Sequence, residues 1–125
     1  MKAEILGHQV DIDGTLLEED RKEIRRQLTE YVSGRRKDFE LSVLPPDSFT
    51  GEVMEEMLRT GHGETRTYGE LAEELDTSAV AVGQACGRNP VPVIVPCHRV
   101  VAEKGVGGYQ YPDLKEKLLD LEKER

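Results

Sequence analysis

The sequence contains no tryptophan, only two cysteines and few aromatic residues, which together make up 5% of the chain. It has no apolar run long enough to span a membrane, and it lacks the charged start, apolar middle and small-residue cleavage site of a secretory signal peptide. These absences favour a cytoplasmic protein. Because cytosolic thiols stay reduced, we expect each cysteine to serve packing, metal binding or nucleophilic chemistry rather than a structural disulfide.

Basic residues are also scarce, with 17 Lys and Arg against 25 Asp and Glu, so the formal net charge is -8 at pH 7. This acidity argues against a nucleic-acid partner, because phosphate binding is driven largely by positive charge. The acid is unevenly spread, however, since no acidic residue lies between Asp76 and Glu103. That stretch could form a surface for a polyanion, or it could be a buried core segment, a reading to which its valines lend weight.

The length of 125 residues suits one domain, or one domain with a small appendage. Residues 5–17 alternate loosely between apolar and polar, and Asp13-Gly14 predicts the turn of a small hairpin. Residues 19–33 have the apolar spacing of an amphipathic helix. Residues 39–44 predict a short strand, which Pro45-Pro46 ends.

That pair of prolines divides the chain into an N-terminal segment, residues 1–46, and a second part, residues 47–125. In the second part we expect a helix that Thr50 caps and Gly61 ends. The inward residues of this helix are Val53, Met54, Met57 and Leu58.

Two further helices follow at close spacing. Thr67, with Glu70 three residues later, has the form of a capping box and opens the first. Residues 79–86 predict the second, and it is unusually rich in small side chains. Two short helices joined by a tight turn form a helix-turn-helix pattern. Beyond them, residues 93–95 predict a short buried strand stopped by Pro96, and residues 114–121 predict a last helix that is apolar inside and charged outside.

The small-residue helix carries no long polar groups that could read base edges in the major groove. Small residues instead allow a close backbone approach to a narrow groove, which fits sequence-independent binding in the minor groove. Tight helix packing within the core would use the same residues, and the pattern alone does not separate these two interpretations.

Cys97 is the candidate nucleophile, because His98 and Arg99 follow it directly. A free thiol has a pKa of about 8.5 and needs a base or a positive field to react at neutral pH. In an extended segment neighbouring side chains point to opposite sides, so His98 would act on the sulfur through a water molecule. The alternative is a buried, unreactive Cys97 beside a surface His98.

The second thiol, Cys86, lies on the small-residue helix, where packing is the favoured interpretation. A zinc site built from Cys86, Cys97, His98 and His62 would match none of the common ligand spacings.

Two stretches carry a resemblance to a known family. The stretch NPVPVIVPCHRVV (residues 89–101), preceded by TYGELA (residues 67–72) and a small-residue helix, resembles the methylated-DNA–protein-cysteine methyltransferases, the O6-alkylguanine-DNA alkyltransferase family. The match covers roughly residues 49–122, and residues 28–43 look like the tail of the family's N-terminal domain. The resemblance implies an α/β fold that is mostly α in its C-terminal part. It implies a winged-helix-like helix-turn-helix active domain behind a shortened α/β N-terminal segment.

The resemblance also implies a DNA repair activity. The protein would flip an alkylated guanine out of duplex DNA and take the alkyl group irreversibly onto Cys97, once per molecule, with no metal or diffusible cofactor. His98, a bridging water and Glu122 would activate the thiol, and Asn89 would hold the turn before it. The residues implied to contact the flipped base are Tyr68, Tyr109 and Val100. Those implied to contact DNA are Thr67, Val80, Ala81, Arg88 and Arg99. The expected partner is duplex DNA that contains O6-alkylguanine, with no membrane, no obligate protein partner and a monomeric state.

Two departures from the family pattern leave alternatives open. Val80 stands where the family usually carries an arginine that fills the gap left by the flipped base, and a valine cannot hydrogen-bond the orphaned cytosine. After Tyr109 the chain has Gln110-Tyr111-Pro112 in place of a run of small glycines and serines. A damage-binding protein of the alkyltransferase-like kind, without efficient transfer, is therefore the second hypothesis. A plain helix-turn-helix regulator is the third.

Overall fold

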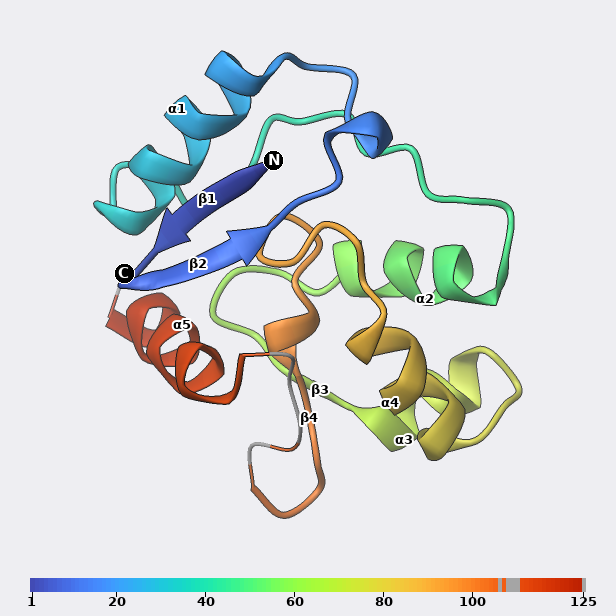
Figure 1. The fold of residues 1–125 in the computed structure, drawn as a ribbon. Coiled ribbons are helices and arrows are strands. Elements are labelled where there is room, and N and C mark those ends of the chain that lie inside the picture. Colours follow the sequence, from blue (N-terminus) through green and yellow to red (C-terminus); the bar gives the residue numbers. More distant parts are fainter. Residues whose placement is uncertain (106, 108–110, 125) are drawn as a thin grey trace.

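The computed structural model describes residues 1–105, 107 and 111–124, and its elements form a mixed α/β fold in which helices predominate (Figure 1). Two two-stranded sheets pair β1 with β2 and β3 with β4. The strands are β1 (Lys2–Ile5), β2 (His8–Asp11), β3 (Arg66–Thr67) and β4 (Val100–Val101). The helices are α1 (Arg21–Val32), α2 (Phe49–Leu58), α3 (Tyr68–Glu74), α4 (Ala79–Gly87) and α5 (Pro112–Glu124), with short 3-10 turns η1 (Gly14–Leu16) and η2 (Cys97–Arg99).

The N-terminal hairpin forms, but its turn is not where the sequence predicted it. Strands β1 and β2 pair antiparallel with Ile5 opposite His8, so the chain reverses at Leu6 and Gly7. Both residues have positive φ angles, 48° and 87°, which suits a tight two-residue hairpin turn. The predicted turn at Asp13-Gly14 is therefore wrong. The side chain of Asp13 instead accepts a hydrogen bond from the backbone N–H of Thr15 and caps η1.

Helix α1 confirms the predicted amphipathic helix. Asp20 caps it by accepting from the N–H of Glu23, and its buried face includes Ile24, Leu28 and Tyr31. The buried apolar residues of the hairpin and of α1 belong to the same hydrophobic core as those of α2 to α5. A division at residue 46 thus runs through a shared core, and the division into an N-terminal segment and an active domain stays a prediction.

The predicted strand at residues 39–44 is wrong. Among the described residues this segment has a single bridge, between Val43 and Leu17. One reason is that side chains accept hydrogen bonds from two of its backbone N–H groups. Gln27 accepts from the N–H of Glu40, and the carboxylate of Glu19 accepts from the N–H of Ser42. The segment therefore crosses the molecule as an extended loop (Figure 1).

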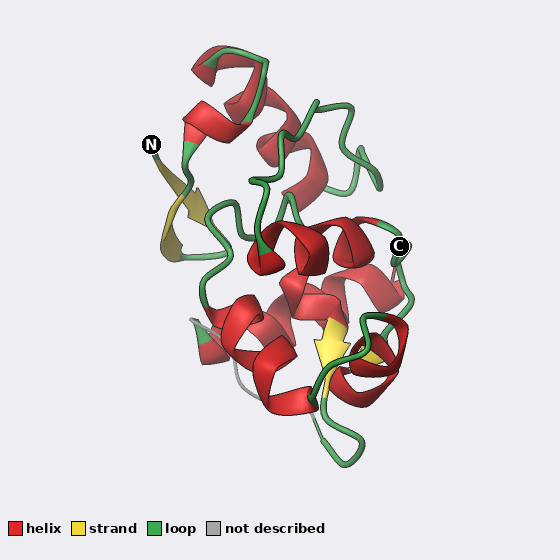
Figure 2. Ribbon diagram, turned by 90° about the vertical axis from the view of Figure 1, so that its right-hand side faces the viewer, coloured by secondary structure: helices red, strands yellow, loops and turns green. Residues whose placement is uncertain are grey.

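Helices α2, α3 and α4 gather below the N-terminal helix and hairpin (Figure 2). Ser48, rather than Thr50, caps α2, and Leu58 is 42% exposed, so its predicted inward position is wrong. The capping box of Thr67 and Glu70 is confirmed with both of its hydrogen bonds. Helices α3 and α4 form the predicted helix-turn-helix, in which Ser78 caps α4 and Val82, Ala85 and Cys86 are buried.

Between α4 and η2 the chain follows a buried loop instead of the predicted strand at residues 93–95. Val93 has a φ of 74°, a left-handed conformation that breaks an extended strand, and Pro92 bridges to Val95. All residues from 91 to 100 are buried. The acid-free stretch is thus largely core, as its valines suggested, apart from the exposed parts of α4.

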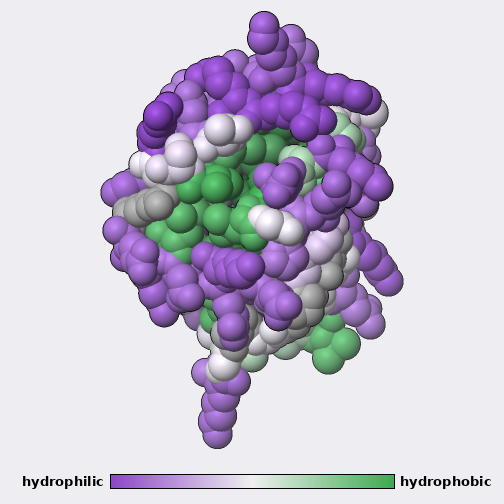
Figure 3. All heavy atoms as spheres, turned by 60° about the vertical axis from the view of Figure 1, so that its left-hand side comes forward, coloured by the Kyte–Doolittle hydropathy of each residue, from purple (hydrophilic) through white to green (hydrophobic). Residues whose placement is uncertain are grey.

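On the face shown in Figure 3, hydrophilic side chains surround a recessed hydrophobic area. Among the described residues, no helix combines the length and the apolar character that crossing a bilayer requires.

Candidate active site

Cys97 lies at the start of η2 and is only 1% exposed. The loop before it is held by Asn89, whose Nδ2 donates to the carbonyl of Val95 (2.9 Å) and whose Oδ1 accepts from the N–H of Val91 (3.1 Å). The N–H of Cys97 in turn donates to the carbonyl of Val95 (2.8 Å). The buried amide of Asn89 therefore holds the backbone that carries Cys97. This is the role that the family resemblance implied for Asn89.

His98 points into the protein and meets Glu122 of α5. Its Nε2 lies 2.7 Å from Oε2 of the carboxylate, and the imidazole is 0% exposed. The alternative of a surface histidine is therefore wrong. So is the expected extended geometry, because residues 97–99 form a 3-10 turn. Burial by itself would raise the pKa of Glu122, but hydrogen bonds from His98 and Arg99 lower it well below its usual range.

This pairing determines which imidazole nitrogen can act as a base. An ionised carboxylate only accepts hydrogen bonds, so Nε2 of His98 carries the proton and Nδ1 of the neutral ring is bare. Nδ1 is buried and has no hydrogen-bond partner among the described residues. Burial lowers the pKa of His98, although Glu122 opposes that shift, so the ring is neutral at physiological pH. A base with a free lone pair thus stands next to Cys97 in the chain.

Arg99 does not lie on the surface that the DNA-binding hypothesis required. It is 7% exposed. Its Nε and Nη2 donate to the two oxygens of Glu122 (2.8 and 2.9 Å), and its Nη1 donates to the carbonyl of Thr60 (2.7 Å). The predicted DNA contact is corrected accordingly, because a guanidinium committed to a buried carboxylate cannot also bind phosphate. Its role here is to anchor Glu122.

Tyr31 joins the same carboxylate from α1, and the sequence did not predict this contact. Its hydroxyl donates to Oε2 of Glu122 at 2.6 Å. The sequence does place Tyr31 on the inward face of its helix. A buried tyrosine hydroxyl generally needs a hydrogen-bond partner, so the inward position of Tyr31 was the signal in the sequence that pointed to a polar partner.

A second cluster joins Tyr68, Val100 and Lys115. The ammonium of Lys115 donates to the carbonyl of Val100 (2.7 Å) and to the hydroxyl of Tyr68 (3.2 Å), and it lies 5.5 Å from the centroid of the Tyr68 ring. Burial, followed by negative charge on the thiols of Cys86 and Cys97, raises the pKa of Tyr68 to about 12. Tyr68 is therefore a neutral phenol close to both thiols.

The sequence missed Lys115, which we expected on the charged outer face of the last helix. The lysine is fully buried. Residues 115, 118 and 122 follow at helical spacing on one face of α5, and that spacing was the available signal. Burial lowers the pKa of Lys115, while the thiols of Cys97 and Cys86 oppose the shift.

The loop after β4 approaches Tyr68 through Gly107. A Cβ atom at Gly107 would lie 2.9 Å from the Tyr68 ring, and the φ of 80° also disfavours a side chain. Tyr109, which the sequence placed against the flipped base, lies outside the described residues.

The remaining predicted DNA-binding residues lie on the helix-turn-helix, away from the buried network. Thr67 is the half-buried N-cap of α3, and Val80 on α4 is 70% exposed. Ala81 is half-buried beside it, and Arg88 is exposed at the end of α4. The structure therefore brings Cys97, His98, Glu122, Tyr68 and Val100 into the core and leaves Val80 and Arg88 facing outward.

Cys86 packs as expected, with its Sγ 3.8 Å from Sδ of Met57. Burial, and then the neighbouring Cys97, raise the pKa of Cys86 to about 12, which makes this thiol unreactive. Over the part of the chain that the structure describes, no three His, Cys, Asp or Glu side chains group together as metal ligands.

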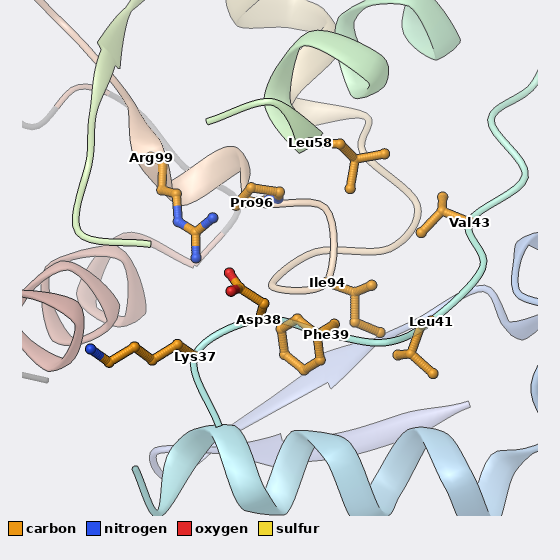
Figure 4. A pocket seen from close by; sticks show the side chains of 9 residues that line it. All are labelled: Lys37, Asp38, Phe39, Leu41, Val43, Leu58, Ile94, Pro96 and Arg99. Atoms are coloured by element: carbon orange, nitrogen blue, oxygen red, sulfur yellow. The ribbon is translucent and has the colours of Figure 1, made fainter. Parts of the chain in front are cut away.

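A separate cavity has the Arg99 side chain as part of its lining (Figure 4). It opens between the extended loop after α1, the end of α2 and the buried loop before η2. Its lining comprises Lys37, Asp38, Phe39, Leu41, Val43, Leu58, Ile94, Pro96 and Arg99. Cys97 does not line this cavity, so it is not the slot that would present a base to the thiol.

Comparison with known proteins identifies the family. The family model described as "6-O-methylguanine DNA methyltransferase, DNA binding domain" matches residues 48–124. A methylated-DNA–protein-cysteine methyltransferase of Archaeoglobus fulgidus is 46% identical over 108 residues, which cover 80% of this chain and 74% of the relative. One from Methanocaldococcus vulcanius is 48% identical over 86 residues, which cover 68% of this chain and 52% of the relative.

The solved structures agree. The crystal structure of Mycobacterium tuberculosis O6-methylguanine methyltransferase matches with a TM-score of 0.76 and 38% identity, over 83% of this chain and 66% of that one. The crystal structure of Mycobacterium tuberculosis OGT in complex with DNA matches with a TM-score of 0.75 and 37% identity, over 82% of this chain and 67% of that one. The chain thus spans between half and three-quarters of the length of these relatives. It belongs to the O6-methylguanine-DNA methyltransferase family.

Proposed function

We propose that this protein repairs O6-alkylguanine in duplex DNA by moving the alkyl group irreversibly onto Cys97. The observation that carries the proposal is the buried His98–Glu122 pair, which leaves Nδ1 of His98 as a bare base on the residue next to Cys97 in the chain. The names of the relatives, and the complex of a structural neighbour with DNA, support the same substrate.

The chemistry is one displacement at a saturated carbon. The Cys97 S–H gives its proton to Nδ1 of His98 by way of a water molecule, and Glu122 stabilises the imidazolium that results. The thiolate attacks the alkyl carbon, the bond from that carbon to O6 breaks, and its electron pair stays on the guanine. The guanine then takes up one proton in place of the alkyl group. A thioether is stable to hydrolysis, so each molecule acts once.

The base must leave the helix for this reaction, because O6 is enclosed in the base stack. Tyr68, a neutral phenol beside the thiols, is placed to donate to the flipped base. The carbonyl of Val100 accepts from Lys115 and has a second lone pair for a base amine. In this proposal Tyr109 flanks the base, as the family resemblance implies, and Asn89 holds the loop that presents Cys97.

The DNA surface in this proposal comprises Thr67, Val80, Ala81 and Arg88, all on α3, α4 or their ends. Val80 acts as an apolar wedge between base steps. We also propose a cytoplasmic monomer without an obligate protein partner. The two cysteines support the compartment, because both are free thiols.

A second candidate function is damage binding without efficient transfer. The specific observation that favours it is Val80, which is 70% exposed at the position where the family's arginine would stand. A valine offers less to stabilise the flipped state than an arginine does.

Intact-mass measurement separates these two functions. After mixing with a duplex that contains O6-methylguanine, we expect the protein to gain one methyl group, located on the Cys97 peptide. Cys97→Ser should abolish the gain, and Cys86→Ser, which removes the other buried thiol, should keep it. Lesion-specific binding without a mass change would support the second function. Methyl removal that survives in Cys97→Ser would contradict the proposal.

A further inference from the structure

Tyr31 lies in α1, outside the residues that match the family model, yet its hydroxyl reaches the carboxylate of Glu122 across 91 positions of sequence. The phenol ring is 1% exposed. Its centroid lies 5.1 Å from that of Phe39, and it meets the ring of His62 edge-on at 6.3 Å. The N-terminal segment thus delivers a rigidly held hydroxyl to the catalytic carboxylate.

The hydroxyl shares one oxygen atom with the catalytic histidine. Among the described residues, three donors meet Oε2 of Glu122: the Tyr31 hydroxyl at 2.6 Å, Nε2 of His98 at 2.7 Å and Nη2 of Arg99 at 2.9 Å. Each donor withdraws negative charge from the oxygen and so weakens its attraction for the other donors. The phenol therefore reduces the pull of Glu122 on the proton of His98.

Around neutral pH, Tyr31 acts as a hydrogen-bond donor to Glu122. Burial, and then the adjacent negative charge of Glu122, raise the pKa of Tyr31 far above its usual range. The hydroxyl consequently keeps its proton. An ionised Glu122 has no proton to give, so the direction of this hydrogen bond does not reverse.

We propose that Tyr31 is a positioning residue for alkyl transfer, which acts through the shared oxygen of Glu122 to limit the basicity of His98. The inference rests on the proposed function. It assigns to the N-terminal segment a part in the chemistry as well as in the core.

Other charged or titratable groups also face His98. Lys115 and Glu122 come from α5, and Cys97 and Arg99 flank the histidine in η2. Lys115 and Arg99 lower the pKa of His98, and Glu122 raises it. His62, from the loop after α2, faces Tyr31. Tyr31→Phe leaves all these groups in place and removes only the hydroxyl, so it isolates the effect of the phenol.

The first measurement needs no DNA. The pKa of His98 is read from the ring nitrogen shifts of histidine-labelled protein in an NMR pH titration. In Tyr31→Phe we expect this pKa to rise, because Oε2 loses one donor and stabilises the imidazolium more strongly. A rise of about half a unit in the pKa of His98 would lower the methyl-transfer rate about threefold on the acid limb of its pH profile. The alkaline plateau should change less.

The matched control is Phe39→Leu, which loosens the packing around the Tyr31 ring but keeps the hydroxyl. We expect it to lower the melting temperature without moving the pKa of His98. A fluorinated tyrosine at position 31, which is a stronger donor, should shift the pKa of His98 in the opposite direction to Tyr31→Phe. If Tyr31→Phe does not fold, the protein with fluorotyrosine at position 31 provides the test instead.

An unchanged His98 pKa in both the folded phenylalanine variant and the fluorotyrosine protein would overturn the inference. An equal shift in Phe39→Leu would do so as well, because packing would then explain it. If the His98 pKa moves as expected while wild-type protein gains no methyl group, the coupling stands and the proposed repair function is what fails.

Discussion

Nε2 of His98 lies 2.7 Å from Oε2 of Glu122, and these two side chains come from η2 and from the last turn of α5. Both are buried. Because this contact joins α5 to the turn that carries Cys97, the position of the last helix and the protonation of His98 depend on the same carboxylate.

Replacing Glu122 with glutamine should therefore affect stability in a pH-dependent way. The pKa of Glu122 in the folded protein is below its ordinary value of 4.5, so the stabilisation is fully present above that value and is lost as the pH falls through the lowered pKa. Near neutral pH we expect Glu122→Gln to reduce the free energy of unfolding by about 3 kcal/mol, because Arg99 loses its buried charge partner and His98 and Tyr31 lose a charged acceptor. Urea unfolding between about pH 5 and pH 3 should show the two proteins converging. A constant difference over that range would contradict the linkage.

Asn89 should be essential to the loop that carries Cys97. Asn89→Ala leaves the N–H of Val91 buried without its partner, at a cost of about 1–3 kcal/mol. It also removes one of two donors to the carbonyl of Val95, which keeps the bond from the N–H of Cys97. We expect a lower urea midpoint and slower methyl uptake. Asn89→Asp keeps the acceptor for Val91 but loses the donor to Val95. Its urea midpoint and its rate of methyl uptake should therefore lie between those of the wild type and of Asn89→Ala. If Asn89→Ala were as stable as the wild type, the loop before Cys97 would not depend on the Asn89 side chain.

Gly107 tests the approach of the loop to Tyr68. Gly107→Ala places a Cβ atom 2.9 Å from the Tyr68 ring, and we expect it to slow methyl transfer by about tenfold because it displaces the phenol that we propose contacts the base. Gly105→Ala is the matched control. Its φ is also positive, 106°, but nothing lies within 4 Å of the added Cβ. Single-turnover rates should separate the two variants, and equal slowing would assign the effect to backbone strain.

Gly51, in the first turn of α2, packs against Pro46 in the segment that leads into the helix. A Cβ atom at Gly51 would lie 1.8 Å from the carbonyl oxygen of Pro46, which is backbone and cannot rotate away. Gly51→Ala should lower the melting temperature by about 5 °C or more. Gly83→Ala, in the middle of α4 with nothing within 4 Å, should instead be neutral or stabilising by about 0.5–1 kcal/mol. A harmless Gly51→Ala would mean that the Pro45-Pro46 segment moves freely.

Val80 should limit the affinity for DNA. It is exposed on α4, and Val80→Arg adds a positive charge and hydrogen-bond donors at the position of the missing arginine. We expect tighter binding to O6-methylguanine duplexes, faster transfer and a salt dependence of binding that is steeper by about one ion. Val80→Ala should slow transfer without changing the salt slope, because it shortens the wedge and leaves the charge unchanged. Fluorescence titrations over a range of salt concentrations measure both effects.

Much of this molecule could be predicted from local signals in the chain. The capping box of Thr67 and Glu70, the apolar spacing of α1 and the small residues of α4 act between neighbours within a turn or two of helix, so they can be read directly. The motif that contains Cys97 and His98 identified the family for the same reason, since its residues are contiguous.

The sequence by itself thus determined where most helices form and which family the chain resembles, and it indicated Cys97 as the candidate nucleophile. Only the tertiary structure decided what surrounds Glu122: Arg99 turns inward to it and Tyr31 reaches it from another helix, while Lys115 is buried against Tyr68. The physical reason is that a buried charge or hydroxyl is stable only beside a partner, and these partners are distant in the chain. Which polar residues a fold can bury therefore depends on contacts that local patterns do not encode.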